Sequence, residues 1–306
     1  MPMFSNLPDT IPQLVAIFLS IIIEALPFVC FGCLVSGFIE TYLSPNLVSK
    51  FLPKKRFFRV LVGISAGFFF PSCECGIVPI VNRFLEKKVP SYTGIPFLIA
   101  APIINPVVLF ATFVAFGNSI KFVLFRLLGA ICLALIVGLI LAYQLDDPIL
   151  LDQPKIHAHA HEHSHPHTTQ LSRGQKFWSA LTHAVDEFFD SGRYLIFGSL
   201  VAATIQVFVP TRLLTSVTHN PLTAILLMML FAFLLSLCSE ADAFIGASLL
   251  SLFGTAPILA FLLFGPVVDI KNLLMMKRYF TTTFIVRYIA IISLLVTIIS
   301  LGVSFL

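Results

Sequence analysis

Two cysteines lie on either side of a glutamate within an apolar stretch of this chain. Cys73, Glu74 and Cys75 follow residues 60–70, which carry no charge, and precede the apolar run 77–81. An acidic side chain near the centre of a bilayer costs roughly 2.5–3.5 kcal/mol, so it usually faces a cavity or a partner and belongs to a functional site. We therefore predict a binding site here, with thiols as soft ligands beside a carboxylate.

The backbone of this motif is predicted to leave the regular helical path, because Pro71, Gly76 and Pro79 surround it. In an extended segment, side chains two residues apart point in the same direction. Cys73 and Cys75 would then present both sulfurs to one ligand, whereas on an intact helix they would diverge.

A second polar cluster interrupts a run of leucine, methionine, phenylalanine and alanine. It contains Cys238, Glu240 and Asp242. The alternative reading is that the carboxylates reach a membrane interface, or that the span ends nearby, but the apolar sequence continues to Phe253 and favours burial. Buried carboxylates need protons, a cation or a basic partner. Because loss of water favours the protonated form, proton coupling is the natural hypothesis.

Two further segments combine proline with a polar residue. Asn105 stands between Pro102 and Pro106, and Asp269 follows Pro266. Broken helices free backbone groups to line a substrate path, as in the centres of many transporters. Kinked packing helices are the alternative, but the similar setting of Asn105 and Asp269 favours a place in the substrate site.

The two halves of the chain resemble each other at an offset of about 165 residues. This offset places Cys73 opposite Cys238. It also places Glu24 opposite Asp190, so both are predicted to take part in proton or ion coupling with Glu240 and Asp242. An internal duplication is expected, with the site where the halves meet. Four spans per half would make the repeat parallel, whereas a segment that only dips into the bilayer would make it inverted.

An alternating histidine tract lies in the polar connection 144–176, between the halves 1–143 and 177–306. Its histidines are His157, His159, His161, His163, His165 and His167. Such a tract binds Zn²⁺ or another divalent metal weakly, and a dispensable linker is the equal alternative. It contains the letters of an H-E-x-x-H motif, but that motif requires a rigid helix, which this tract does not offer.

Composition predicts an all-α polytopic membrane protein. The 306 residues are 58% hydrophobic and only 11% charged, whereas soluble domains are nearer a quarter charged. The net charge of +4 is too small and too dispersed for a nucleic-acid partner. About eight transmembrane helices are expected, in two repeated four-span halves with proline-broken helices near the centre. Their predicted ranges are 11–39, 57–81, 92–116, 119–143, 188–209, 222–250, 253–275 and 283–306.

The two cysteine–acid motifs, together with the Pro102–Pro106 segment between them, resemble the ArsP-like family of predicted permeases. The resemblance covers most of the chain and implies a polytopic protein of about eight spans. It also implies membrane cysteines that act as soft ligands, since the characterised branch exports trivalent organoarsenicals. Some members resemble one subunit of a two-component permease, which implies a second membrane subunit as partner. The histidine tract is outside the family pattern and favours a transition-metal connection.

The sequence thus predicts a multi-pass permease of the cytoplasmic membrane that moves a soft metal or metalloid species. Cys73, Glu74, Cys75, Cys238, Asn105 and Asp269 are the expected substrate ligands. No required cofactor and no enzymatic activity are expected, and no G-x-x-x-x-G-K-[ST] loop for ATP occurs. A non-transporting accessory subunit of a metal-responsive complex is the alternative. Counts of lysine and arginine in the eight-span scheme favour both termini and the histidine tract outside.

Overall fold

The computed structural model describes residues 7–43, 52–70, 74–144, 149–150, 173–208 and 220–305. These residues are almost entirely helical, and their one β-type contact is an isolated bridge between Leu150 and Phe280. Four helical segments in this part of the chain are long and apolar enough to cross a membrane: Thr10–Tyr42, Ser91–Ala115, Ile120–Tyr143 and Thr282–Ser304. The prediction of an all-α membrane protein is therefore confirmed.

Long and short helices follow in the same order in the two halves. The first half contains α1 (Leu7–Tyr42), α3 (Arg56–Phe69), α4 (Glu74–Glu86), α5 (Ser91–Ile104), α6 (Pro106–Ala115) and α7 (Ile120–Tyr143). The second half contains α8 (Arg173–Phe208), α9 (Pro221–Leu235), α10 (Ser239–Phe253), α11 (Thr255–Phe264), α12 (Ile270–Tyr279) and α13 (Thr282–Ser304).

Two segments that were predicted as single spans are instead pairs of short helices. The predicted span 57–81 is divided between α3 and α4, and the span 222–250 is divided between α9 and α10. Helix α9 ends at Leu235 and is capped by Ser236, which adopts a left-handed conformation, and Cys238 caps the start of α10. These helices have 13 to 15 residues. At about 1.5 Å per residue, each is too short to cross a hydrocarbon core of about 30 Å alone.

The two predicted breaks at proline and polar residues are present. Asn105 ends α5 and caps α6, where Pro106 is the first residue. Asp269 caps α12 after the break that follows α11. Proline at the first position of a helix is favourable because its missing N–H has no intrahelical partner there. The side chains of Asn105 and Asp269 accept hydrogen bonds from otherwise unpaired N–H groups.

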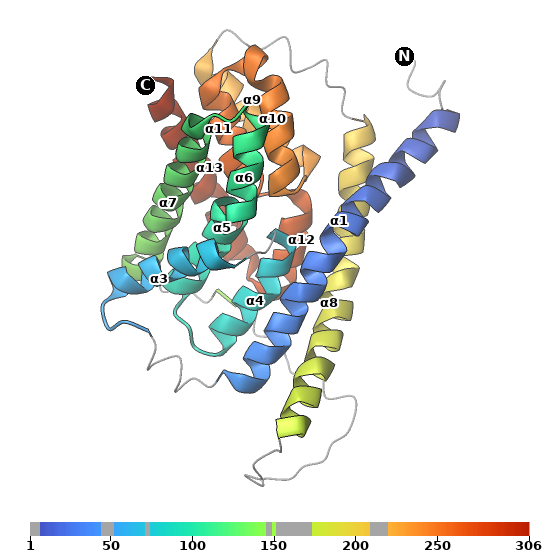
Figure 1. Ribbon diagram of the computed structural model, residues 1–306, viewed down its shortest axis with the longest axis vertical. Coiled ribbons are helices and arrows are strands. Elements are labelled where there is room, and N and C mark those ends of the chain that lie inside the picture. The colour runs from blue at the N-terminus through green and yellow to red at the C-terminus, as the bar shows by residue number, and fades with distance from the viewer. Residues whose placement is uncertain are drawn as a thin grey trace.

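The two short pairs enter the bundle from opposite ends. We call the lower end the one at which α1 and α7 terminate and α8 begins, as drawn in Figure 1, and the upper end the opposite one. A guanidinium nitrogen of Arg56, at the start of α3, donates to the carbonyl of Ala142 near the end of α7. Helix α3 therefore starts at the lower end. Pro221, Phe253 and Lys121 line one pocket, so α9 begins and α10 ends beside the start of α7, at the upper end.

The longest helices, α1 and α8, lie side by side along one flank of the molecule (Figure 1). Helix α1 also packs on α4, and α8 packs on α12. The remaining helices form a bundle around a core to which α5 and α11 contribute fully buried apolar side chains. The tips of the two short pairs meet between this bundle and the α1–α8 flank.

Candidate functional site

Three helix starts meet at the centre of the molecule because the chain breaks its helices there. Glu74 begins α4, Ser239 begins α10, and Asp269 caps α12. The hydroxyl of Ser239 lies 3.4 Å from Oε2 of Glu74 and donates to it, which joins the tips of the two short pairs. Helix starts carry unpaired N–H groups and a partial positive charge, so this arrangement favours acidic side chains and anionic ligands.

Glu74 forms a buried ion pair with Lys271 of α12. The Nζ atom of Lys271 lies 3.0 Å from Oε1 of Glu74 and 3.7 Å from Oδ2 of Asp269. All three residues are at most 3% exposed. Sequence reasoning missed Lys271, although a lysine two residues after Asp269 in an apolar segment is a signal that intramembrane charge rules would have found.

Cys238 contacts Glu24 of α1 across the flank. Its sulfur lies 2.6 Å from Oε1 of Glu24 and donates to it, and the same sulfur accepts from the backbone N–H of Ala241 at 3.4 Å. Cys238 is buried, whereas Glu24 stays exposed on its other side. The predicted coupling residue Glu24 and the predicted ligand Cys238 are therefore in direct contact.

These groups surround a small cavity of about 10 Å³. That is close to the room needed for one water molecule. Its lining consists of Ile21, Glu24, Ala25, Phe28, Glu74, Cys75, Cys238 and Lys271. The structure thus brings Cys75 to the same cavity as Cys238, and both thiols are free of disulfides. Cys73 lies outside the described residues.

Two further buried charges, on Arg126 and Asp242, lie near the start of α10. Arg126 of α7 is fully buried, and its guanidinium donates to the hydroxyl of Thr112 at 2.7 Å and to the carbonyl of Ser239 at 3.0 Å. Asp242 is buried and faces Gly265, where an added Cβ atom would lie only 2.8 Å from its Oδ2. Sequence reasoning also missed Arg126, which is the only charged residue between 122 and 143.

The other predicted site residues lie apart from the cavity lining. Asn105 and Asp269 are buried caps of α6 and α12, although Asp269 reaches the Lys271 ammonium. Glu240 lies in the first turn of α10 and is partly buried. Asp190 is paired with Arg193 and Arg278. All six histidines of the tract lie outside the described residues.

Within the described residues, no three histidine, cysteine or acidic side chains come close enough to hold a metal ion. A structural zinc site usually has four protein ligands around the metal ion. The conformation described here therefore holds two thiols at the cavity without a complete metal-ligand set.

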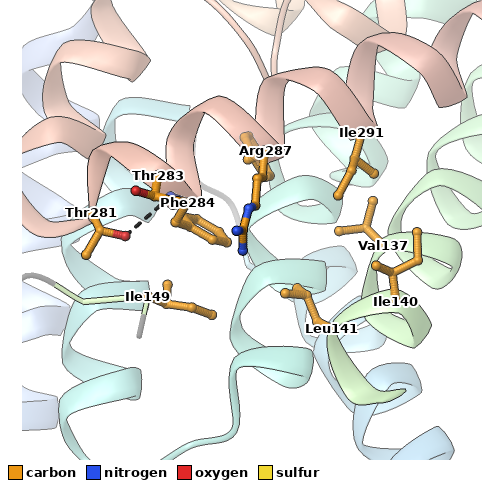
Figure 2. A pocket seen from close by; sticks show the side chains of 10 residues that line it. Val137, Ile140, Leu141, Ile149, Thr281, Thr283, Phe284, Arg287 and Ile291 are labelled. Atoms are coloured by element: carbon orange, nitrogen blue, oxygen red, sulfur yellow. Dashed lines mark hydrogen bonds between the residues drawn. The ribbon is translucent and has the colours of Figure 1, made fainter. Parts of the chain in front are cut away.

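A larger pocket of about 250 Å³ lies between α7 and α13, away from these residues (Figure 2). Its lining is mostly apolar and includes Val137, Leu141, Phe284 and Ile291, with Arg287 reaching between them. None of the predicted site residues line it. We place the candidate site at the small polar cavity, because the buried charges and thiols are there.

The fold and the central cluster define a helical membrane protein with charged and thiol groups at the breaks of its helices. The chain belongs to the ArsP_1 family, described as "Predicted permease", whose model matches residues 10–305.

Two relatives match over nearly their whole lengths. The first is the "Putative two-component membrane permease complex subunit" of Streptococcus mutans serotype c (strain ATCC 700610 / UA159), which is 60% identical over 298 residues and covers 97% of both chains. The second is "UPF0718 protein YcgR" of Bacillus subtilis (strain 168), which is 47% identical over 287 residues and covers 92% of this chain and 95% of the relative. No solved structure matches the chain significantly.

Proposed function

We propose that this membrane permease moves a small soft metal or metalloid species through the central cavity. The observation that carries the proposal is the position of Cys75 and Cys238 on one cavity, with Glu24 in contact with the second thiol. Thiolates are the soft ligands that such species prefer. Glu24 is placed to take the proton that Cys238 releases when its sulfur binds the substrate.

The buried charges at the centre favour coupling to protons. Three buried carboxylates, on Glu74, Asp242 and Asp269, face two buried cations, on Arg126 and Lys271. An excess carboxylate inside a membrane needs a proton or a cation. Binding of a cationic substrate would replace that proton, so substrate and proton would move in opposite directions.

We further propose that the two halves form an inverted repeat. In this arrangement each half would cross three times, by a long helix, a broken helix and a second long helix; α1, α5–α6, α7 and α13 are long and apolar enough to do so. The pairs α3–α4 and α9–α10 would enter from opposite ends and turn back. Three crossings per half reverse the direction of the second half. Alternating access around a central site is the usual mechanism of such repeats.

Charge at the two ends supports an orientation with the lower end in the cytoplasm. Basic residues gather at the lower end in the described part of the chain, and Lys121 stands at the upper end. Those at the lower end include Arg56, Arg59, Lys87, Lys88, Lys277 and Arg278. Cytoplasmic ends of membrane proteins carry an excess of lysine and arginine. In this orientation both termini lie outside the cell, as expected from the sequence, whereas the histidine tract lies in the cytoplasm.

The permease is also proposed to have a second membrane subunit as its partner. The Streptococcus relative is named as a complex subunit, and it shares 60% of its residues with this chain. On that basis we propose that the permease works together with another membrane protein. Affinity purification from native membranes, followed by mass spectrometry, tests this proposal, and recovery of this chain alone in a mild detergent would contradict it.

Substrate flux into sealed vesicles tests the site itself. We expect Cys75→Ser and Cys238→Ser each to lower the flux of a trivalent arsenical or of Zn²⁺ by about tenfold or more, which corresponds to ~1.4 kcal/mol of lost stabilisation. Cys132→Ser is the matched control, because this cysteine is exposed on α7 away from the cavity. Equal flux in all three variants, with equal amounts of inserted protein, would overturn the site.

A further inference from the structure

A second buried polar cluster lies below the central cavity. The guanidinium of Arg83 in α4 donates to Oε2 of Glu187 in α8, with N–O distances of 3.1 and 2.5 Å. Glu187 also accepts a short hydrogen bond from the hydroxyl of Tyr279 in α12, and this hydroxyl lies 2.8 Å from that of Ser191. The side chain of Glu187 is only 4% exposed.

The cluster reaches α1 as well. Lys87 lies 3.1 Å from Oε1 of Glu40, and Arg83 lies 3.7 Å from its Oε2. Four helices, α1, α4, α8 and α12, are therefore joined by charged and hydrogen-bonded groups at one level. Nine residues separate Arg83 from Glu74 on α4, so this level is about 14 Å below the cavity.

Among the described residues, the same flank is joined to the upper half by neutral donors, such as the amide of Gln206 in α8 to the carbonyl of Leu235 in α9, and by no ion pair. Neither α1 nor α8 packs on α10 as α1 packs on α4. At the offset of the repeat, the positions that correspond to Arg83 and Glu187 hold Ser248 and Ile21. Ser248 donates to a carbonyl of its own helix. Glu24, at the level of the cavity, stays exposed.

We propose that the Arg83–Glu187–Tyr279 cluster is the gate on the lower side of the permease, and that the structure represents the state in which this gate is closed. The cluster must separate before the cavity can open toward the lower end. Its charged hydrogen bonds are stronger than neutral ones, so they hold this side shut. The described residues of the upper side carry no charged cluster of this kind, so the upper side is the one that opens in this state. The inference rests on the proposed permease function.

Chemical labelling of Cys33 tests the gate. This buried cysteine of α1 lies beside Ser191 and Glu187 and is 1% exposed. Membrane vesicles of both orientations would be treated with a membrane-impermeant maleimide, and labelling at Cys33 would be followed by peptide mass spectrometry. We expect Glu187→Gln to speed labelling roughly tenfold, and only from the lower side, because a charge-assisted contact across three helices is lost. Tyr279→Phe removes one hydrogen bond and leaves the ion pair, so we expect a smaller increase of about threefold.

Glu86→Gln is the matched control. Glu86 also pairs with Arg83, at 2.7 Å, but it lies on the same helix and ties α4 only to itself. Unchanged labelling in Glu187→Gln and Tyr279→Phe, or an equal increase in Glu86→Gln, would overturn the gate. Labelling does not require the substrate. If Glu187→Gln speeds labelling while Cys238→Ser leaves flux intact, the gate stands and the proposed site fails. If Glu187→Gln leaves labelling unchanged while Cys238→Ser lowers flux, the gate fails and the proposed site stands.

Discussion

At the scale of single residues, the centre of this protein contains buried charged side chains, each of which is energetically costly in a membrane unless it has a partner. Glu74 and Lys271 are both nearly inaccessible and lie 3.0 Å apart. Arg126, also buried, donates to the backbone at the start of α10. Each charge is stabilised by a group from a distant part of the chain, so the pairs fix how the halves meet. Removal of one partner of such a pair destabilises the fold, because the other charge stays buried without compensation.

Substitutions of Glu74 and Lys271 are expected to have non-additive effects on the free energy of unfolding. Lys271→Met leaves a buried carboxylate without its partner, and we expect a loss of about 3–5 kcal/mol in the free energy of unfolding. Glu74→Gln combined with Lys271→Met removes both charges and should recover most of that loss. The measurement is thermal or denaturant unfolding of the purified protein in detergent.

Arg193→Gln serves as the control for this cycle. Arg193 pairs with Asp190, but its side chain is 69% exposed. Exposed ion pairs contribute about 0–1 kcal/mol, so this variant should unfold almost as the parent does. A double variant as unstable as Lys271→Met alone would show that the pair is not the source of the effect.

At the scale of elements, the breaks in the helices matter more than their lengths. Helices α4, α10 and α12 start at the cavity because Glu74, Cys238 and Asp269 stand at their first turns. Helix α1 approaches α4 closely, since a Cβ atom on Gly32 would collide with the backbone carbonyl of Gly76. This close packing brings Glu24 within reach of Cys238.

In sequence, the histidine tract lies in the polar connection between α7 and α8. We propose that the tract captures Zn²⁺ or another divalent metal, because alternating imidazoles bind such ions without a fixed geometry. Deletion of residues 157–167 should abolish weak Zn²⁺ binding in calorimetric titrations, while Cys75→Ser should leave that binding in place. Unaltered Zn²⁺ binding after the deletion would favour a simple linker.

At the scale of the whole molecule, the direction of the chain distinguishes two topologies. Four full crossings per half would put the histidine tract on the same side as both termini. Three crossings and a returning pair per half would put the tract on the opposite side. Figure 1 shows that α1 begins and α13 ends at the upper end, whereas α7 ends and α8 begins at the lower end.

Accessibility of tags tests this topology. We expect tags at either terminus to react with an impermeant probe on intact cells, and a tag within residues 157–167 to react only after the membrane is opened. The physical reason is that α3 starts and α4 ends at the lower end, and α9 starts and α10 ends at the upper end, so each pair returns to the side from which it entered. Labelling of all three tags on intact cells would instead support eight full spans.

The sequence by itself determined the membrane class, the polar motifs and the two breaks at Asn105 and Asp269. These follow from local chemistry, because composition, proline and capping side chains act within a few residues. It also singled out Glu24, Glu74, Cys75 and Cys238, which share one cavity.

Only the tertiary structure decided which charges meet. The contacts of Lys271 with Glu74 and of Arg83 with Glu187 join residues 197 and 104 positions apart in sequence. The sequence predicted an irregular backbone around Cys73–Cys75, but residues 57–81 were still counted as one crossing span, since apolar residues continue through both α3 and α4. Pairing of buried charges depends on how long helices pack in three dimensions, and the spacing of residues along one chain does not encode it locally.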